Sequence, residues 1–234
     1  MADLTGADGG LRELALFAGA GGGILAGKLL GWRTVCAVER DAYAACVLAA
    51  RQNDGILPPF PIWDDVRTFD GRPWRGRADV VSGGFPCQAY STAAAGANNA
   101  DDLWPEMRRI VADAAPRYVF AENVARRAID AAADDLEAMG YEVRCTAVAA
   151  RDVGADHIRQ RYWLLAYADD RRELLRAFND EARMRPRLQV GVWGSEPERA
   201  PVADGMAGEV DELRLTGNGQ VPAVAIAALL ELCE

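Results

Sequence analysis

Short apolar runs alternate with helix-like segments along most of the chain, and this alternation restricts the fold more than any other feature. Runs typical of buried strands occur at residues 14–17, 34–38, 79–82, 117–121, 141–148 and 162–166. Segments with helical spacing follow or separate them at residues 24–30, 41–51, 103–114, 130–139 and 223–230. Strands that alternate with helices form largely parallel sheets with helices on both faces. We therefore predict an α/β fold with a doubly wound, mostly parallel sheet.

Composition narrows the class of protein. The 234 residues, 50% of them hydrophobic, are enough for one sizeable α/β core. Five scattered cysteines predict reduced thiols and a cytoplasmic location. The single histidine, His157, and the lack of a Cys/His cluster predict no metal site. No apolar run reaches the roughly 20 residues of a membrane span, and the start does not resemble a signal peptide. The net charge of −9 argues against nonspecific coating of nucleic acid but permits local contact with DNA.

Residues 83–88, at the end of the third strand, read Gly-Gly-Phe-Pro-Cys-Gln. A cysteine on a turn at the carboxyl end of a parallel strand lies where α/β proteins place their chemistry. Partial exposure near a helix start favours the thiolate, which is the nucleophilic form of cysteine. The alternative is a small core thiol, because unpaired cysteine is among the most buried residue types. The flanking glycines, proline and glutamine favour Cys87 as a nucleophile.

A second motif follows the first strand. Residues 19–23 read Gly-Ala-Gly-Gly-Gly and precede a helix, an arrangement that lets a cofactor approach backbone amides. Glu39 ends the next strand, about 20 residues on, where a carboxylate can hold ribose hydroxyls. The spacing differs from the G-x-G-x-x-G of dinucleotide binders. It therefore favours S-adenosylmethionine over a nicotinamide cofactor, with a glycine turn that binds no ligand as the other alternative.

Five motifs, in this order, resemble those of the DNA cytosine-5 methyltransferases. They are Phe-Ala-Gly-Ala-Gly-Gly at 17–22, Gly-Phe-Pro-Cys-Gln at 84–88 with Ser91, Glu-Asn-Val at 122–124, Arg-x-Arg at 159–161 and Gly-Asn at 217–218. The resemblance covers most of residues 14–168 and the C-terminal segment. It implies the Rossmann-like fold of S-adenosylmethionine-dependent methyltransferases and methyl transfer to carbon 5 of cytosine in double-stranded DNA.

The resemblance also implies catalytic roles. Cys87 would add to carbon 6 of a flipped-out cytosine, and Glu122 would supply a proton at ring nitrogen 3. Arg161 would bind the cytosine carbonyl oxygen, and Arg159 would orient Glu122 and the loop at 89–102, which we expect to be mobile. For both arginines the alternative is a surface position on a strand. The implied substrate contacts are Phe85, Pro86, Gln88, Ser91 and Asn123.

A further set of residues is implied for the cofactor. Glu39 would bind the ribose, Asp65 the adenine amino group and Val66 the adenine ring, with Asp64 as the rival of Asp65. The remaining cofactor contacts implied are Phe17, Gly19, Gly21, Leu103 and Asn218. A core role is the alternative for Phe17, Val66 and Leu103.

The sequence departs from the family pattern in three places. Ala15 stands where the family often has an acid, and Asp156-His157 replaces the usual Pro-Gln before the two arginines. The family's sizeable recognition domain is also missing. We expect residues 1–168, completed by 207–234, to form the catalytic and cofactor-binding domain. Residues 169–206 would be a reduced target-recognition segment, too short for a core of its own.

These features predict a compact phage or bacterial modification enzyme that acts on double-stranded DNA without a metal or a membrane. We expect a monomer, with a partner subunit that supplies the missing recognition surface as the alternative. Two other functions fit the same scaffold. One is cytosine modification of RNA or free nucleotides, and the other is a catalytically silent DNA-binding relative.

Overall fold

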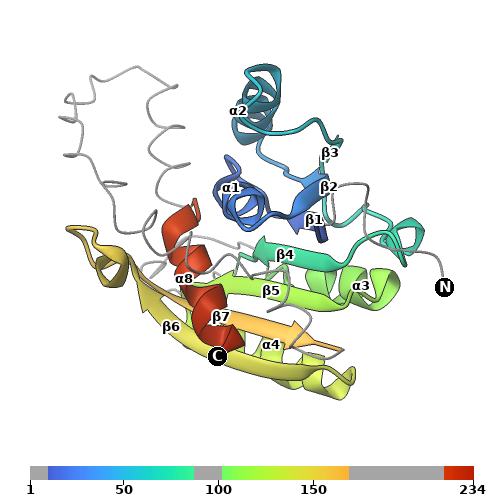
Figure 1. Cartoon of the computed structure of the whole chain (residues 1–234). Helices are drawn as coiled ribbons and strands as arrows, with labels where there is room; N and C mark the ends of the chain where they lie inside the picture. The colour runs from blue at the N-terminus through green and yellow to red at the C-terminus, as the bar shows by residue number, and fades with distance from the viewer. Residues whose placement is uncertain (1–9, 87–101, 169–218) are drawn as a thin grey trace, which may run out of the picture.

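The computed structural model describes residues 10–86, 102–168 and 219–234, and these form a layered α/β structure (Figure 1). The sheet has seven strands in the order β3-β2-β1-β4-β5-β7-β6. β7 runs antiparallel to β5 and β6, and the other neighbouring strands pair in parallel. The mostly parallel α/β fold predicted from the sequence is therefore confirmed. The strands are β1 (Arg12–Leu16), β2 (Arg33–Val38), β3 (Ile62–Trp63), β4 (Val80–Gly84), β5 (Tyr118–Asn123), β6 (Glu142–Ala149) and β7 (Gln160–Tyr167).

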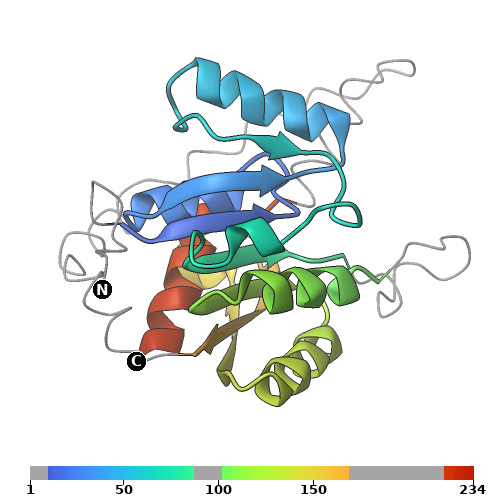
Figure 2. The same cartoon turned by 90° about the vertical axis from the view of Figure 1, so that its right-hand side faces the viewer.

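Helices cover both faces of the sheet, as a doubly wound fold requires (Figures 1 and 2). On one face lie α1 (Gly22–Leu29), α2 (Ala42–Asn53) and α8 (Pro222–Cys233), and on the other lie α3 (Trp104–Ala114) and α4 (Arg126–Ala138). Two short 3₁₀ helices, η1 (Arg72–Trp74) and η4 (Ala150–Val153), complete the described elements. Each face of the sheet thus has its own apolar core.

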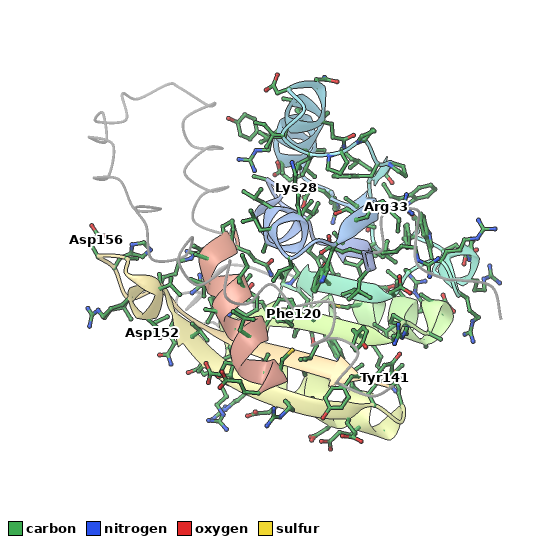
Figure 3. The ribbon with its side chains drawn as sticks, in the orientation of Figure 1. Lys28, Arg33, Phe120, Tyr141, Asp152 and Asp156 are labelled. Carbon is green, nitrogen blue, oxygen red and sulfur yellow. The ribbon has the colours of Figure 1, made fainter. Side chains whose placement is uncertain are left out.

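The side chains of β5 pack into the cores on both faces of the sheet. All six of its residues are buried, and successive side chains of a strand point to opposite faces. Val119 and Ala121 pack in the core beneath α3 and α4. Tyr118 and Phe120 belong to the core under α8, and Figure 3 labels Phe120 there. A strand buried on both faces reads as a continuous apolar run, which is why the sequence predicts it well.

Four elements differ from the sequence prediction, which did not include the 3₁₀ helices η1 and η4 and differs also at α4 and β3. α4 begins at Arg126 instead of residue 130, because Ala128 and Ile129 already pack into the core. β3 was not predicted, since it is only two residues long and follows a proline-rich segment. The expected mobile loop at 89–102 lies outside the described residues except for Asp102, and the expected recognition segment at 169–206 lies entirely outside them.

Within the described part of the chain, no helix combines the length and the apolar character needed to cross a membrane.

Candidate active site

The carboxyl ends of the parallel strands bring several predicted site residues to one edge of the sheet. The glycine turn follows β1, Glu39 follows β2, and Phe85 follows β4. Glu122 lies near the end of β5, opposite Gly84 of β4 in the strand register. The motifs recognised in the sequence therefore converge in space wherever the structure describes them.

Glu122 is a buried carboxyl, only 8% exposed. Arg161, near the start of β7, places its Nε 3.0 Å from Glu122 Oε1. Burial raises the pKa of Glu122, and the charges of Arg161 and Arg159 together with a hydrogen bond from Gln220 oppose this only in part. The carboxyl can therefore carry a proton at a higher pH than an exposed glutamate does.

Arg159 precedes β7 in an uncommon backbone conformation. Its φ of +31° lies in the left-handed region that side chains other than glycine seldom adopt. Its Nη2 donates a hydrogen bond of 2.6 Å to the carbonyl of Gly219. Burial lowers the pKa of Arg159, and the neighbouring Arg161 lowers it further. Arg159 thus ties the start of β7 to the segment before α8 and acts on Glu122 through its charge.

Asn123 joins the turn after β4 to the start of α4. Its Nδ2 donates to the carbonyl of Phe85 at 2.8 Å, and its Oδ1 accepts from the amide of Ala125 at 2.9 Å. Phe85 is buried and packs against Trp104, with ring centroids 5.1 Å apart. These contacts fix the backbone at Phe85, directly before Pro86. Cys87 itself lies outside the described residues, as do Gln88, Ser91 and Asn218.

The glycine turn borders a cavity that is open to solvent, and the empty space there amounts to about 390 Å³ when the open solvent is included. Phe17, Gly19 and Gly21 have positive φ angles of 52°, 54° and 86°. A Cβ at Gly21 would lie 2.8 Å from Leu48 Cδ2, so a side chain there would disturb the packing of α2. The cavity is lined by residues 15–19, 23–24 and 82–84, with Glu122, Gly219 and Gln220.

Glu39 supports the turn with both carboxyl oxygens. Oε2 accepts from the amide of Gly19 at 2.6 Å, and Oε1 accepts from the amide of Asp41 at 2.7 Å. Because each carboxylate oxygen has two acceptor sites, both can still accept a bond from a hydroxyl group. The arrangement fits a nucleoside whose ribose diol meets Glu39 beside the glycine turn.

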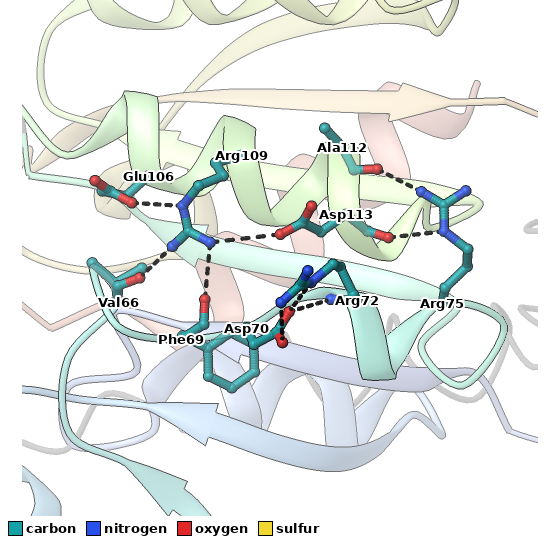
Figure 4. A network of polar contacts seen from close by, with 9 residues as sticks. All are labelled: Val66, Phe69, Asp70, Arg72, Arg75, Glu106, Arg109, Ala112 and Asp113. Atoms are coloured by element: carbon teal, nitrogen blue, oxygen red, sulfur yellow. Dashed lines mark hydrogen bonds and ion pairs between the residues drawn. The ribbon is translucent and has the colours of Figure 1, made fainter.

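The loop that carries Asp65 and Val66 is held from α3. Arg109 donates from Nη2 to the carbonyl of Val66 at 2.8 Å and from Nη1 to the carbonyl of Phe69 at 2.9 Å (Figure 4). Glu106 accepts from Arg109 Nε at 2.9 Å and orients the guanidinium. Asp65 itself is half-buried and accepts from the amide of Arg67 at 2.9 Å.

Val66 and Leu103 pack in the core. The sequence analysis gave this role as the alternative to contact with the cofactor. Val66 is 4% exposed within the core under α3, and Leu103 packs partly buried against the same core. The amide of Leu103 donates to the carbonyl of Pro86 at 3.2 Å. As far as the structure describes the chain, the residues lining the glycine-turn cavity include neither of these nor Asp65.

The departure at Asp156-His157 lies in the middle of the loop between η4 and β7, where Figure 3 labels Asp156. His157 Nδ1 lies 3.1 Å from Asp156 Oδ1, and both side chains are exposed. Neither residue lines the pocket of Glu122, Arg159 and Arg161.

Three residues of the site were not singled out from the sequence: Arg109, Gly219 and Gln220. Gly219 and Gln220 follow Asn218 directly, so the same motif could have indicated them. Arg109 is one of several arginines on an amphipathic helix, and no local pattern distinguishes it. Its role becomes visible only when the carbonyls it binds are placed in space.

Comparison with known proteins agrees with this geometry. The model of the family described as C-5 cytosine-specific DNA methylase matches residues 11–200. The chain belongs to this family. The resemblance drawn from the motifs is thereby confirmed.

The curated relatives that the chain matches are longer than the chain itself. Type II methyltransferase M.PspPI of Psychrobacter sp. (strain TA137) is 33% identical over 139 residues, 55% of this chain and 32% of that protein. Type II methyltransferase M.HhaI of Haemophilus parahaemolyticus is 29% identical over 172 residues, 69% of this chain and 50% of that protein. The S. pombe Dnmt2 methyltransferase shares the fold, with a TM-score of 0.55 at 19% identity over 68% of this chain and 52% of that one. The chain thus spans about a third to a half of the length of these relatives.

Proposed function

We propose that the protein transfers a methyl group from S-adenosylmethionine to carbon 5 of cytosine in double-stranded DNA. The observation that carries this proposal is the position of Glu122. It is a buried carboxyl paired with Arg161, and it lines the glycine-turn cavity as well as the adjoining pocket of Arg159 and Arg161. A carboxyl with a raised pKa, beside a cavity bordered by a glycine turn, is what activation of a pyrimidine ring next to a nucleoside cofactor requires.

The chemistry needs a nucleophile because carbon 5 of cytosine is unreactive. Addition of the Cys87 thiolate to carbon 6 of a flipped-out base moves electron density to carbon 5. Glu122 donates a proton to ring nitrogen 3 and so neutralises the charge that develops there. Carbon 5 would then gain the methyl group, with S-adenosylhomocysteine as the product that leaves. Water would take the proton from carbon 5, the thiolate would leave as the ring double bond reforms, and the proton on ring nitrogen 3 would return to Glu122. Arg161 holds the Glu122 carboxyl and contacts the cytosine carbonyl oxygen.

The described residues fit the cofactor. The glycine turn brings backbone close to the cavity, and Glu39 retains acceptor sites for a ribose diol. When bound, S-adenosylmethionine supplies an electrophilic methyl group on sulfur. Asp65 and Val66 are proposed at its adenine end, on the loop that Arg109 holds, and Phe17, Leu103 and Asn218 are proposed to complete the site.

The proposal that the substrate is DNA rests on the family to which the chain belongs and on the position of the motifs. Phe85 and Pro86 directly precede Cys87 and are proposed to contact the substrate. Gln88 and Ser91 are proposed to contact the DNA at the flipped base. Residues 169–206 are proposed as the reduced recognition segment. The Type II relatives support a role in a bacterial or phage restriction-modification system.

Duplex DNA containing 5-fluorocytosine tests the proposal. Fluorine at carbon 5 cannot leave as a proton does, so the enzyme should remain covalently attached to the DNA in the presence of S-adenosylmethionine. Intact-mass measurement should show the adduct for the wild type and none for Cys87→Ser. Substrates with many sequence contexts are needed because the target site is unknown. Absence of an adduct on every cytosine-containing duplex would contradict the proposal, and tritium transfer to transfer RNA alone would favour the RNA alternative.

Removal of the Glu39 carboxylate should weaken S-adenosylmethionine binding. Glu39→Ala removes the proposed ribose acceptor and the acceptor for the Gly19 amide. We expect Kd, measured by calorimetry, to rise about 10- to 100-fold, the size of one or two charged hydrogen bonds. Asp41→Ala is the matched control, because Asp41 caps α2 by accepting from the Ala44 amide at 3.0 Å. That control should lower the melting temperature without changing Kd, and unchanged affinity in Glu39→Ala would remove Glu39 from the site.

A further inference from the structure

Gln220 lies where the two cavities of the site meet. It belongs to the short segment that precedes α8, and it lines both the glycine-turn cavity and the pocket of Arg159 and Arg161. Glu122 and Gly219 are the other residues that line both. A side chain in this position can contact the proposed acid and the proposed cofactor site at once.

Glycines from two separate motifs leave the space that Gln220 occupies. A Cβ at Gly22 would lie 2.0 Å from the Gln220 carbonyl oxygen, and one at Gly23 would lie 2.3 Å from its Oε1. A Cβ at Gly84, on β4, would lie 3.1 Å from Gln220 Nε2 and 2.6 Å from Glu122 Oε2. The glycine turn and the end of β4 are therefore shaped around this one residue.

The amide of Gln220 donates a hydrogen bond to the Glu122 carboxyl. Glu122 Oε1 lies against Arg161 Nε, whereas Glu122 Oε2 lies on the Gly84 side with Gln220 Nε2. The two carboxyl oxygens thus face different donors, one from β7 and one from the segment before α8. Together these contacts restrict the orientation of the carboxyl.

The charged groups that face Glu122 in the described part of the chain are Arg161 on β7 and Arg159 before it. Both are cations, and the charge of each lowers the pKa of Glu122. Gln220 is a neutral donor, so it orients the carboxyl without adding a further positive charge. A neutral donor can also accept a return bond when the carboxyl is protonated, because the glutamine amide carries both kinds of group.

From these contacts we propose that Gln220 is a positioning residue for Glu122. This inference rests on the proposed function of the Glu122 carboxyl as a proton donor. Gln220 holds the carboxyl in the orientation for proton donation and links it to the glycine turn that borders the cofactor cavity. It acts through Glu122 and does not itself exchange a proton with the substrate.

The pH dependence of kcat distinguishes this role from simple packing. A donor to the carboxylate favours its ionised form, so loss of the Gln220 amide should raise the pKa of Glu122 further. Because the working form is the protonated one, Gln220→Leu should retain its own maximal rate to a higher pH than the wild type. That maximal kcat should be roughly tenfold lower, as expected for one lost hydrogen bond.

Two further variants separate positioning from folding. Gln220→Glu has nearly the same shape but places a second carboxyl beside Glu122, so the alkaline limb should move further still. Gln52→Leu is the matched control. Gln52 is also half-buried, and its Oε1 accepts from the Phe60 amide at 3.2 Å, away from the site. It should lower the melting temperature and leave the pH profile in place.

A measurement that needs no turnover completes the test. The ¹³C signal of the Glu122 carboxyl, assigned by its loss in Glu122→Gln, should titrate at a higher pH in Gln220→Leu than in the wild type. Unchanged titration and an unchanged alkaline limb in both Gln220 variants would overturn the inference. Failure of the proposed function shows itself differently, as a wild-type enzyme that forms no adduct with 5-fluorocytosine DNA.

Discussion

Replacement of Glu122 by glutamine should lower kcat for methyl transfer by about 10²- to 10⁴-fold, the contribution of a positioned general acid. Glutamine keeps the shape of the side chain and an oxygen for Arg161, but it has no acidic proton for ring nitrogen 3. Addition of the thiolate to carbon 6 then builds up charge on the ring without relief. Adduct formation with 5-fluorocytosine DNA should slow by a similar factor, while calorimetry should show little change in S-adenosylmethionine binding.

The pH profile gives the same test a second readout. Burial raises the pKa of Glu122, and the working form is protonated, so wild-type kcat should fall as the pH rises through that pKa. The residual activity of Glu122→Gln should lack this alkaline limb. Asp130→Asn is the control, because Asp130 also pairs with an arginine, Arg126, at 3.4 Å, and lines neither cavity of the site; it should leave kcat and the alkaline limb unchanged. A kcat for Glu122→Gln within threefold of the wild type would remove Glu122 as the acid.

The sequence predicted those parts of the candidate site whose position follows from the direction of the parallel strands. Each parallel strand ends at the same edge of the sheet, so a motif placed after a strand is also placed in space. This is why the glycine turn, Glu39, Phe85 and Glu122 converge as expected.

What the sequence could not predict depends on strand order and on long-range contacts. β7 lies between β5 and β6 and runs antiparallel to both, which brings Arg161 beside Glu122. Local pattern does not encode that order. Gln220 reaches the same carboxyl only because α8 packs against α1 and the sheet. The position of the loop that carries Asp65 and Val66 likewise depends on Arg109. This arginine lies on α3, and the carbonyl groups that it binds belong to that loop.

Removal of the Asp79 carboxylate should be the most destabilising of these substitutions. Asp79 accepts from Arg12 Nε at 2.8 Å, from its Nη2 at 2.9 Å and from its backbone amide at 2.9 Å. The side chain of Asp79 is 9% exposed and that of Arg12 is 13% exposed. The pair lies where β1 and β4 begin, whereas the site lies where these strands end. Asp79→Ala leaves the guanidinium without its partner, so the free energy of unfolding should fall by about 3–5 kcal/mol. Chemical denaturation measures it.

Asp70→Ala supplies the matched control. Asp70 makes the same three contacts with Arg72, at 2.9, 2.9 and 3.0 Å, but both side chains are exposed, so its loss should change stability little. Burial alone would raise the pKa of Asp79, yet the bonds and charge of Arg12 outweigh it and lower the pKa. The stabilisation is therefore complete above the unfolded pKa of about 3.9 and is lost as the pH falls through the lower folded value. The stability difference between wild type and Asp79→Ala should shrink in that acid range, and a difference that persists there would show that the ion pair is not its source.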